Sequence, residues 1–201
     1  MRLLIATHNL NKLTEIRAIF SLPSLELVTL NDFSDLPDVV EDGATFEANA
    51  IKKAVAFACA ARLWTIADDS GLGVDALNGA PGVYSARYAG EPVSYEANNV
   101  KLLNEMKNIT TRKAVFQCVI ALASPDGKTR VTEGKCKGQI IHSLRGRNGF
   151  GYDPLFVPDG YNQTFAEMKS SLKNKISHRA IALSRAHKKW GAPENWSYGV
   201  V

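Results

Sequence analysis

The stretch 114–141 restricts the fold more than any other part of this sequence, because its pattern is that of a long β-hairpin. The run "AVFQCVIALAS" (114–124) is the longest strand candidate, and "PDGK" (125–128) supplies turn residues directly after it. The segment "TRVTEGKCKGQII" (129–141) then predicts a second strand that pairs with the first. A fold of this chain must therefore contain a β-sheet with two long neighbouring strands.

Shorter patterns elsewhere predict further strands and several helices. Apolar runs predict strands at 2–6, 25–30 and 64–67, and a return strand near 72–77 after a turn at Asp68-Asp69. Apolar residues at helical spacing predict helices at 10–20, 45–62, 94–107 and 177–190. Helices mixed with separate strands and one hairpin indicate an α/β fold with a mixed β-sheet flanked by helices.

The composition indicates one globular domain over residues 1–201. Hydrophobic residues make up 45% of the chain and charged residues 22%, which is ordinary for a packed domain. The net charge is +4, and its Lys and Arg residues are scattered instead of massed in a block. This balance argues against a dedicated nucleic-acid binder and suits a protein whose ligand is a small polyanion.

The cysteines and the apolar runs bear on location. Cys59, Cys118 and Cys136 are an odd three with no CxxC pair, which is typical of reduced thiols and disfavours a zinc site. The start "MRLLIATHN" is too short an apolar stretch for a signal peptide, and no run approaches the roughly 18 residues that span a bilayer. We therefore predict a cytoplasmic protein that does not bind a membrane.

The adjacent carboxylates in "TIADDSGLGVDALNGAPG" (65–82) need an explanation, because like charges repel and Asp is disfavoured in strands. A turn is one explanation, since turns select Asp, Ser and Gly. A divalent cation is the other, because it converts the repulsion into binding. Glu41 and Asp42 are possible further carboxylates, or simply part of a solvated acidic loop.

Three other segments carry residues suited to a nucleotide. "THNLNK" (7–12) lies between a predicted strand and helix, where an anion site and an ordinary helix cap are equally reasonable. "GFGYDP" (149–154) offers a π-face and hydrogen-bonding groups for a nucleobase, or closes a hairpin. "KNKISHR" (173–179) places donor side chains at the start of the last helix, without the Gly-x-Ser-x-Gly elbow of a serine nucleophile.

Taken together and in this order, five segments resemble the inosine/xanthosine triphosphate pyrophosphatase family. They are "THNLNK", "EDGATFEANAIKKA", "ADDSGLGVDALNGAPGVYSARYAG", "GFGYDPLF" and "SHRAIAL". The resemblance spans residues 2–187 and implies an elongated α/β fold with two lobes around a central nucleotide cleft. It also implies a Mg²⁺-dependent homodimer that cuts purine nucleoside triphosphates such as ITP, dITP and XTP to the monophosphate and pyrophosphate, cleansing the nucleotide pool.

The resemblance also implies roles for individual residues. It assigns the triphosphate to the segment Thr7, His8, Asn9, Leu10, Asn11 and Lys12, with Lys53 near it. It makes Asp69 the proton acceptor and a metal ligand, with Asp68 beside it and Ser70 touching the substrate. It assigns the base to Phe150, Gly151, Tyr152, Asp153, Lys173, His178 and Arg179.

Two positions depart from the family pattern. His8 stands where the phosphate loop commonly has a glycine, which reduces backbone freedom there. Val40 stands where the family often has its upstream metal-binding glutamate, so the neighbouring Glu41 becomes the candidate metal ligand. A nucleotide-binding sensor without turnover is the competing function, and it would keep the loops without needing Asp68 and Asp69.

Overall fold

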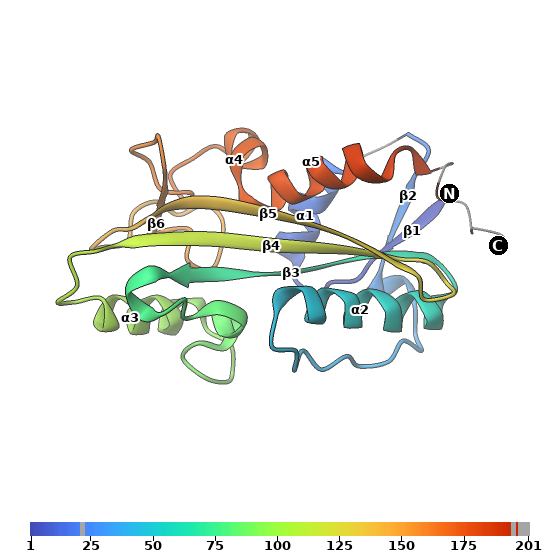
Figure 1. Cartoon of the computed structure of the whole chain (residues 1–201), viewed down its shortest axis with the longest axis horizontal. Helices are drawn as coiled ribbons and strands as arrows, with labels where there is room; N and C mark the ends of the chain where they lie inside the picture. Colours follow the sequence, from blue (N-terminus) through green and yellow to red (C-terminus); the bar gives the residue numbers. More distant parts are fainter. Residues whose placement is uncertain (21–22, 194–195, 197–201) are drawn as a thin grey trace. The chain divides into compact units, whose positions relative to one another are not determined.

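The computed structural model describes residues 1–20, 23–193 and 196, and it contains one six-stranded sheet (Figure 1). Its strands follow the order β2-β1-β3-β4-β5-β6. They are β1 (Arg2–Ile5), β2 (Glu26–Thr29), β3 (Trp64–Val74), β4 (Lys113–Ala123), β5 (Thr129–Ile140) and β6 (Phe156–Pro158). Because β1 pairs in parallel with β2 and β3 while β5 pairs antiparallel with β6, the predicted mixed sheet is confirmed.

Five α-helices accompany the sheet in the described residues. They are α1 (Leu10–Ile19), α2 (Phe46–Ala61), α3 (Tyr95–Glu105), α4 (Ser170–Ile176) and α5 (His178–Trp190), with 3-10 turns η1 (Leu30–Asp32), η2 (Asp75–Leu77) and η3 (Gly82–Arg87). The α/β class is confirmed, and each predicted helix is present within a few residues of its expected bounds. The helix α4 and the strand β6 were not predicted. The helix has only seven residues and the strand only three, which is too short for a clear periodic pattern.

The prediction of a turn at Asp68-Asp69 is wrong. The strand β3 runs without interruption from Trp64 to Val74 and takes both aspartates into the sheet. Asp in a strand is unfavourable by itself, but cationic side chains from other elements compensate the charge here, as described below. The predicted second strand at 72–77 is therefore the end of the same strand.

The chain divides into two compact units. Unit 1 comprises Met1–Asp69, Cys118–Gly134 and Arg179–Val201, and unit 2 comprises Ser70–Gln117 and Lys135–His178. The strands β3, β4 and β5 contribute residues to both units. The expectation of one domain over 1–201 stays a prediction.

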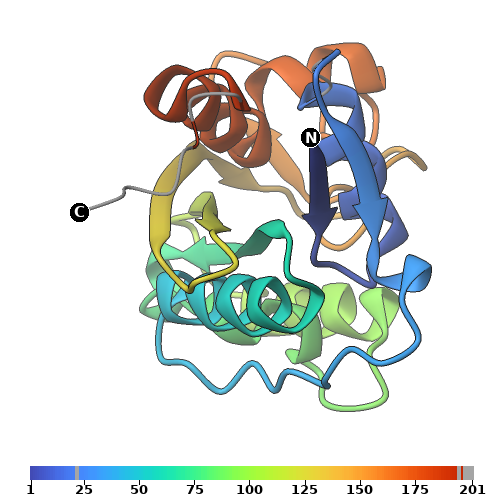
Figure 2. The same ribbon diagram turned by 90° about the vertical axis from the view of Figure 1, so that its right-hand side faces the viewer.

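In unit 1, helices cover both faces of the sheet (Figures 1 and 2). Successive strand residues point to opposite faces, so Leu3 and Ile5 of β1 join one core cluster and Leu4 joins another. The first cluster packs residues of α1 and α5, and the second packs the alanine-rich face of α2. The same alternation in β3 places Ile66 in the first cluster and Ala67 in the second.

Unit 2 has a core of its own that is rich in aromatic rings. Phe116 lies with its ring centroid 4.8 Å from that of Phe156 and 6.0 Å from that of Phe165. Leu102 and Met106, from α3 and the residue that ends it, are buried in the same cluster. Across the described parts of both units, no helix combines the length and the apolar character that a bilayer crossing requires.

Candidate active site

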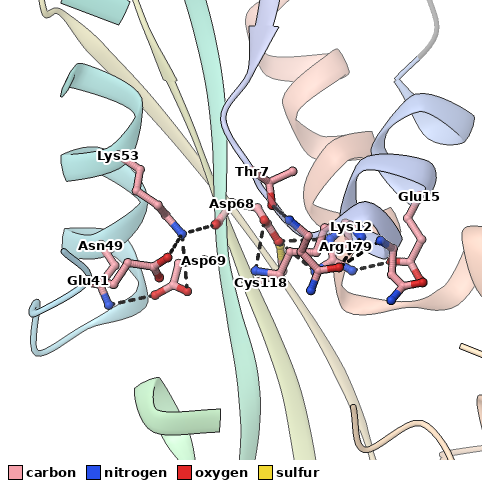
Figure 3. A network of polar contacts seen from close by, with 12 residues as sticks. Thr7, Lys12, Glu15, Glu41, Asn49, Lys53, Asp68, Asp69, Cys118 and Arg179 are labelled. Atoms are coloured by element: carbon pink, nitrogen blue, oxygen red, sulfur yellow. Dashed lines mark hydrogen bonds and ion pairs between the residues drawn. The ribbon is translucent and has the colours of Figure 1, made fainter. Parts of the chain in front are cut away.

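The two adjacent aspartates of β3 point to opposite sides of the sheet (Figure 3). Asp68 continues the series of Trp64 and Ile66 and faces α1 and α5, whereas Asp69 continues the series of Ala67 and faces α2. They therefore do not form a single dicarboxylate site, and the interpretation that both would hold one ion is wrong. The physical reason is the two-residue period of a strand.

Asp68 is compensated by two cationic side chains on its side of the sheet. Its Oδ2 accepts hydrogen bonds from Arg179 Nη2 at 2.8 Å and Nε at 3.1 Å, and its Oδ1 lies 3.2 Å from Lys12 Nζ. The Asp68 side chain has no exposed surface and Arg179 is 1% exposed. Arg179 also pairs with Glu15, and Cys118 Sγ lies 3.8 Å from Asp68 Oδ2. Burial opposes the charge of Asp68, but Lys12 and Arg179 outweigh it and hold its pKa far below the usual range.

Asp69 lies on the other side with Lys53, Glu41 and Asn49. Lys53 Nζ is 3.9 Å from Asp69 Oδ1, 3.0 Å from Glu41 Oε1 and 2.7 Å from the main-chain oxygen of Asp68. Asn49 Nδ2 donates to Asp69 Oδ2 at 3.0 Å. Asn49 and Lys53 are four residues apart on α2, so the helix presents both on one face, as their spacing predicts.

The loop before α2 is tied to this cluster by Asn49. Its Oδ1 accepts the Gly43 N–H at 2.7 Å, and a side chain at Gly43 would place Cβ 2.6 Å from that oxygen. Thr45 caps the helix by accepting the Ala48 N–H at 3.1 Å. One amide thus holds both the acidic loop that carries Glu41 and the carboxylate of Asp69.

The pKa of Asp69 is raised to about 6. Burial is the main cause, because it disfavours the charged carboxylate, and the negative charge of Glu41 adds to the effect. Lys53 and Lys12 act in the opposite direction without cancelling it. Two neighbouring aspartates thus differ in protonation behaviour because their surroundings differ, a contrast that recurs at catalytic sites.

The donor set around Asp69 fits Mg²⁺. The described residues contain no group of three His, Cys, Asp or Glu side chains placed to hold a metal. Mg²⁺ in nucleotide sites is commonly held by one or two carboxylates, with water and substrate phosphates completing the shell. Asp69 and Glu41 both lie beside Lys53 Nζ and supply two such hard oxygen donors. Asp68 does not belong to this set, because its carboxylate is buried against Arg179.

The segment 7–12 forms a capped start of α1, one of the two readings that the sequence left open. Asn9 Oδ1 accepts the N–H groups of Asn11 at 2.9 Å and Lys12 at 3.2 Å, and Thr7 Oγ1 accepts the Asn9 N–H at 3.1 Å. His8, Leu10 and Asn11 are exposed, and Leu10 reaches 69%. The role of this segment in binding a triphosphate stays a prediction.

The loop Gly149–Asp153 of unit 2, named here the base-side loop, folds around the carboxylate of Asp153. That carboxylate accepts the Phe150 N–H at 2.8 Å and lies 2.6 Å from Lys173 Nζ. Lys173 Nζ also lies 5.1 Å from the centroid of the Phe150 ring. The structure therefore brings Phe150, Asp153 and Lys173 together, as the resemblance implies.

Three other predicted base-side residues are placed differently. Tyr152 is 4% exposed in the unit 2 core and its hydroxyl donates to Ser85 O at 2.9 Å, so its side chain serves the core. His178 is buried with its ring stacked 4.7 Å from that of Phe116. Arg179 belongs to unit 1 and pairs with Asp68, and its role at the base stays a prediction.

Gly149→Ala is expected to disrupt the base-side loop. A Cβ at Gly149 would lie 2.0 Å from Asp153 Oδ2, and the φ of +73° is unfavourable for any other residue. Gly160→Ala is the matched control, because its φ is +82° and nothing lies within 4 Å of its Cβ. Because of the positive φ, we expect the free energy of unfolding of both variants to fall by about 1 kcal/mol. Only Gly149→Ala is expected to lose nucleotide binding, measured by calorimetry. Equal affinities for the two variants would contradict this role.

The sequence analysis did not assign Glu15 or Cys118 to the site. Glu15 follows Lys12 by three residues on α1, a spacing that places the two on neighbouring positions of the helix surface. Its pairing with Arg179, 164 residues away, left no local signal. Cys118 is one of the alternating apolar residues of β4 and could not be distinguished from the others.

Comparison with known proteins adds independent findings. Residues 3–189 match the model of the Ham1 family. A protein of Geobacter sulfurreducens named dITP/XTP pyrophosphatase is 51% identical over 193 residues, which cover 94% of this chain and 97% of that protein. One of Desulforamulus reducens with the same name is 49% identical over 92% of this chain and 94% of its own. The solved Staphylococcus aureus Ham1 protein superposes with a TM-score of 0.85 at 44% identity, covering 94% of this chain and 97% of that one.

Proposed function

The chain belongs to the Ham1 family, and from this membership we propose that it is a pyrophosphatase for nonstandard purine nucleoside triphosphates. The substrates are dITP, XTP and ITP, and the products are the nucleoside monophosphate and pyrophosphate. The observation that carries the proposal is Asp69, a largely buried carboxylate with a raised pKa that lies beside Lys53 and Glu41. A binding protein without turnover would have no use for such a group.

The residues of unit 1 divide the chemical work. Asp69 accepts the proton of the attacking water, a role that suits a carboxylate whose pKa has been raised toward neutrality. Lys53 and Lys12 oppose the negative charge of the triphosphate. Asp69 and Glu41 would hold Mg²⁺, which when bound supplies charge neutralisation at the phosphates. Asp68 acts through Lys12 and Arg179, which it orients from the opposite side of β3.

The base-side loop accounts for a preference for 6-oxo purines. Phe150 offers a ring face to a base, and Lys173 is a hydrogen-bond donor with no acceptor capacity. The oxygen at position 6 of hypoxanthine or xanthine accepts a hydrogen bond, whereas the amino group of adenine donates one. A site whose groups are donors leaves them unpaired against adenine, which discriminates by orders of magnitude when the groups are buried.

We further propose a cytoplasmic homodimer. The three cysteines are free, which accords with a reducing compartment, where the nucleotide pool also lies. Unit 2 exposes Tyr84, Val93 and Val100 at 59%, 55% and 50%, on or near η3 and α3, which contact each other. Large apolar side chains gathered in this way favour a protein interface. Light scattering is expected to give twice the chain mass of 21.9 kDa, and Tyr84→Glu to shift it toward the single chain. A single-chain mass at every concentration would contradict the homodimer.

The test of the function is product analysis with dITP, XTP, ITP and dATP in the presence of Mg²⁺. We expect pyrophosphate from the first three, little from dATP, and loss of activity when the metal is chelated. Tight binding without product would identify a nucleotide sensor instead. Release of orthophosphate alone would identify an ordinary phosphatase.

A further inference from the structure

The base-side loop is held from two sides. Asp153 holds it from within through the Phe150 N–H and Lys173 Nζ. The helix α3 holds it from a second direction, because Asn99 Nδ2 donates to the Gly151 carbonyl at 3.0 Å. Tyr95, four residues earlier on the same face of α3, has its ring 6.0 Å from that of Phe150.

The side chain of Asn99 is buried and makes one hydrogen bond to the described residues, the bond to Gly151. The residue is 5% exposed, and its Oδ1 has no hydrogen-bond partner among the described residues. An unsatisfied buried acceptor costs stability, so a leucine of similar size would be the more favourable residue for folding alone. The hydrogen bond that the Asn99 amide donates to the base-side loop therefore explains why an asparagine stands at this position.

That donor fixes the direction of one peptide group. The Gly151–Tyr152 peptide is trans, so its carbonyl and its N–H point in opposite directions. With the Gly151 carbonyl held by Asn99, the Tyr152 N–H is turned away from that amide. Within the described part of the chain this N–H makes no hydrogen bond, although its residue is 4% exposed. Gly151 permits the arrangement through its φ of +61°.

We propose that Asn99 is a positioning residue for base selection. By holding the Gly151 carbonyl, it keeps the Tyr152 N–H turned away from the Asn99 amide, as a donor for the 6-oxo group of the purine. A backbone N–H cannot become an acceptor, so the peptide held this way opposes the amino group of adenine. This inference rests on the proposed function and names the residue that gives the base-side loop its selectivity.

The test compares two substitutions of Asn99 with the same substitutions at Asn104. Asn99→Leu removes the donor and the unpaired oxygen together, and Asn99→Asp keeps the shape while replacing the donor by an oxygen. Asn104 lies on the same helix and is exposed, and its side chain makes no hydrogen bond to a described residue. The measurements are kcat/KM for dITP and dATP, inhibition by pyrophosphate, and the melting temperature.

For both Asn99 variants we expect kcat/KM for dITP to fall about fivefold to tenfold, the loss of one hydrogen bond. The kcat/KM for dATP is expected to stay the same, so the preference for dITP over dATP falls by the same factor. Inhibition of the Asn99 variants by pyrophosphate is expected to match that of the wild type. The Asn104 variants are expected to match the wild type in every measurement. Asn99→Leu is expected to melt within a few degrees of the wild type. If Asn99→Leu does not fold, Asn99→Asp provides the test.

Two results would overturn the inference while leaving the proposed function intact. One is an unchanged preference for dITP over dATP in both Asn99 variants. The other is a parallel weakening of pyrophosphate inhibition, which would mean that Asn99 only supports the fold. A wild type that neither binds nor hydrolyses dITP would overturn the proposed function, and the inference with it.

Discussion

Asp69→Asn is expected to abolish nearly all turnover and to make the protein more stable at neutral pH. Turnover falls because the amide cannot accept a proton, and a positioned base is worth roughly 10²–10⁴-fold. The amide keeps the shape of the side chain and can still accept the hydrogen bond from Asn49. The lost basicity is therefore separated from any change of shape.

The gain in stability follows from the pKa of about 6. A carboxyl whose folded pKa is raised above its unfolded value stabilises the fold fully below about pH 4 and loses that contribution as the pH rises through 6. The shift of about 2 units corresponds to at most about 3 kcal/mol. Asn does not titrate, so the free energy of unfolding of the variant, relative to the wild type, is expected to rise between pH 4 and pH 7.5.

The measurement is urea unfolding at both pH values in the presence of a chelator, with pyrophosphate release measured separately. Asp75→Asn is the control, because Asp75 is exposed directly after the same strand. It is expected to change neither activity nor the pH dependence. Retention of more than half of the activity by Asp69→Asn would remove Asp69 from the role of base. An equal stability difference at pH 4 and pH 7.5 would contradict the electrostatic argument.

Arg179→Met is expected to be among the most destabilising substitutions in the chain. It removes both hydrogen bonds to a carboxylate that has no exposed surface, and it also leaves Glu15 without its partner guanidinium. Breaking a buried ion pair from one side costs about 3–5 kcal/mol, because an uncompensated charge stays behind. For a chain of about this size the melting temperature should fall by roughly 6–20 °C.

A second substitution distinguishes this explanation from simple loss of packing. Adding Asp68→Leu removes the abandoned charge, so the double variant is expected to recover part of the loss. Arg185→Met is the matched control, since Arg185 is exposed on the same helix and donates to a main-chain oxygen, Glu133 O, at 2.8 Å. In the folded fraction of Arg179→Met, a narrowed preference for dITP over dATP would support the predicted role of Arg179 at the base. A double variant no more stable than the single one would contradict the charge argument.

Local patterns were sufficient for most of the elements and for the family. The helix at 45–62 and the hairpin at 114–141 were predicted because apolar spacing and turn residues act over short distances, and both are present. The resemblance rested on five short segments in a fixed order, and the Ham1 match confirms it. Once that helix is predicted, the four-residue spacing of Asn49 and Lys53 puts both on one of its faces.

The sequence alone determined which charged residues this protein has, which helices and strands carry most of them, and to which family it belongs. Only the tertiary structure decided that Asp68 and Asp69 continue a strand and point to opposite sides of it. That outcome depends on Lys12, Arg179 and Lys53, which the fold brings to β3 from α1, α5 and α2. Without those cations a strand through two aspartates is unfavourable and a turn is the reasonable prediction. The charges that reverse this preference lie up to 111 residues away, beyond the range of any local pattern.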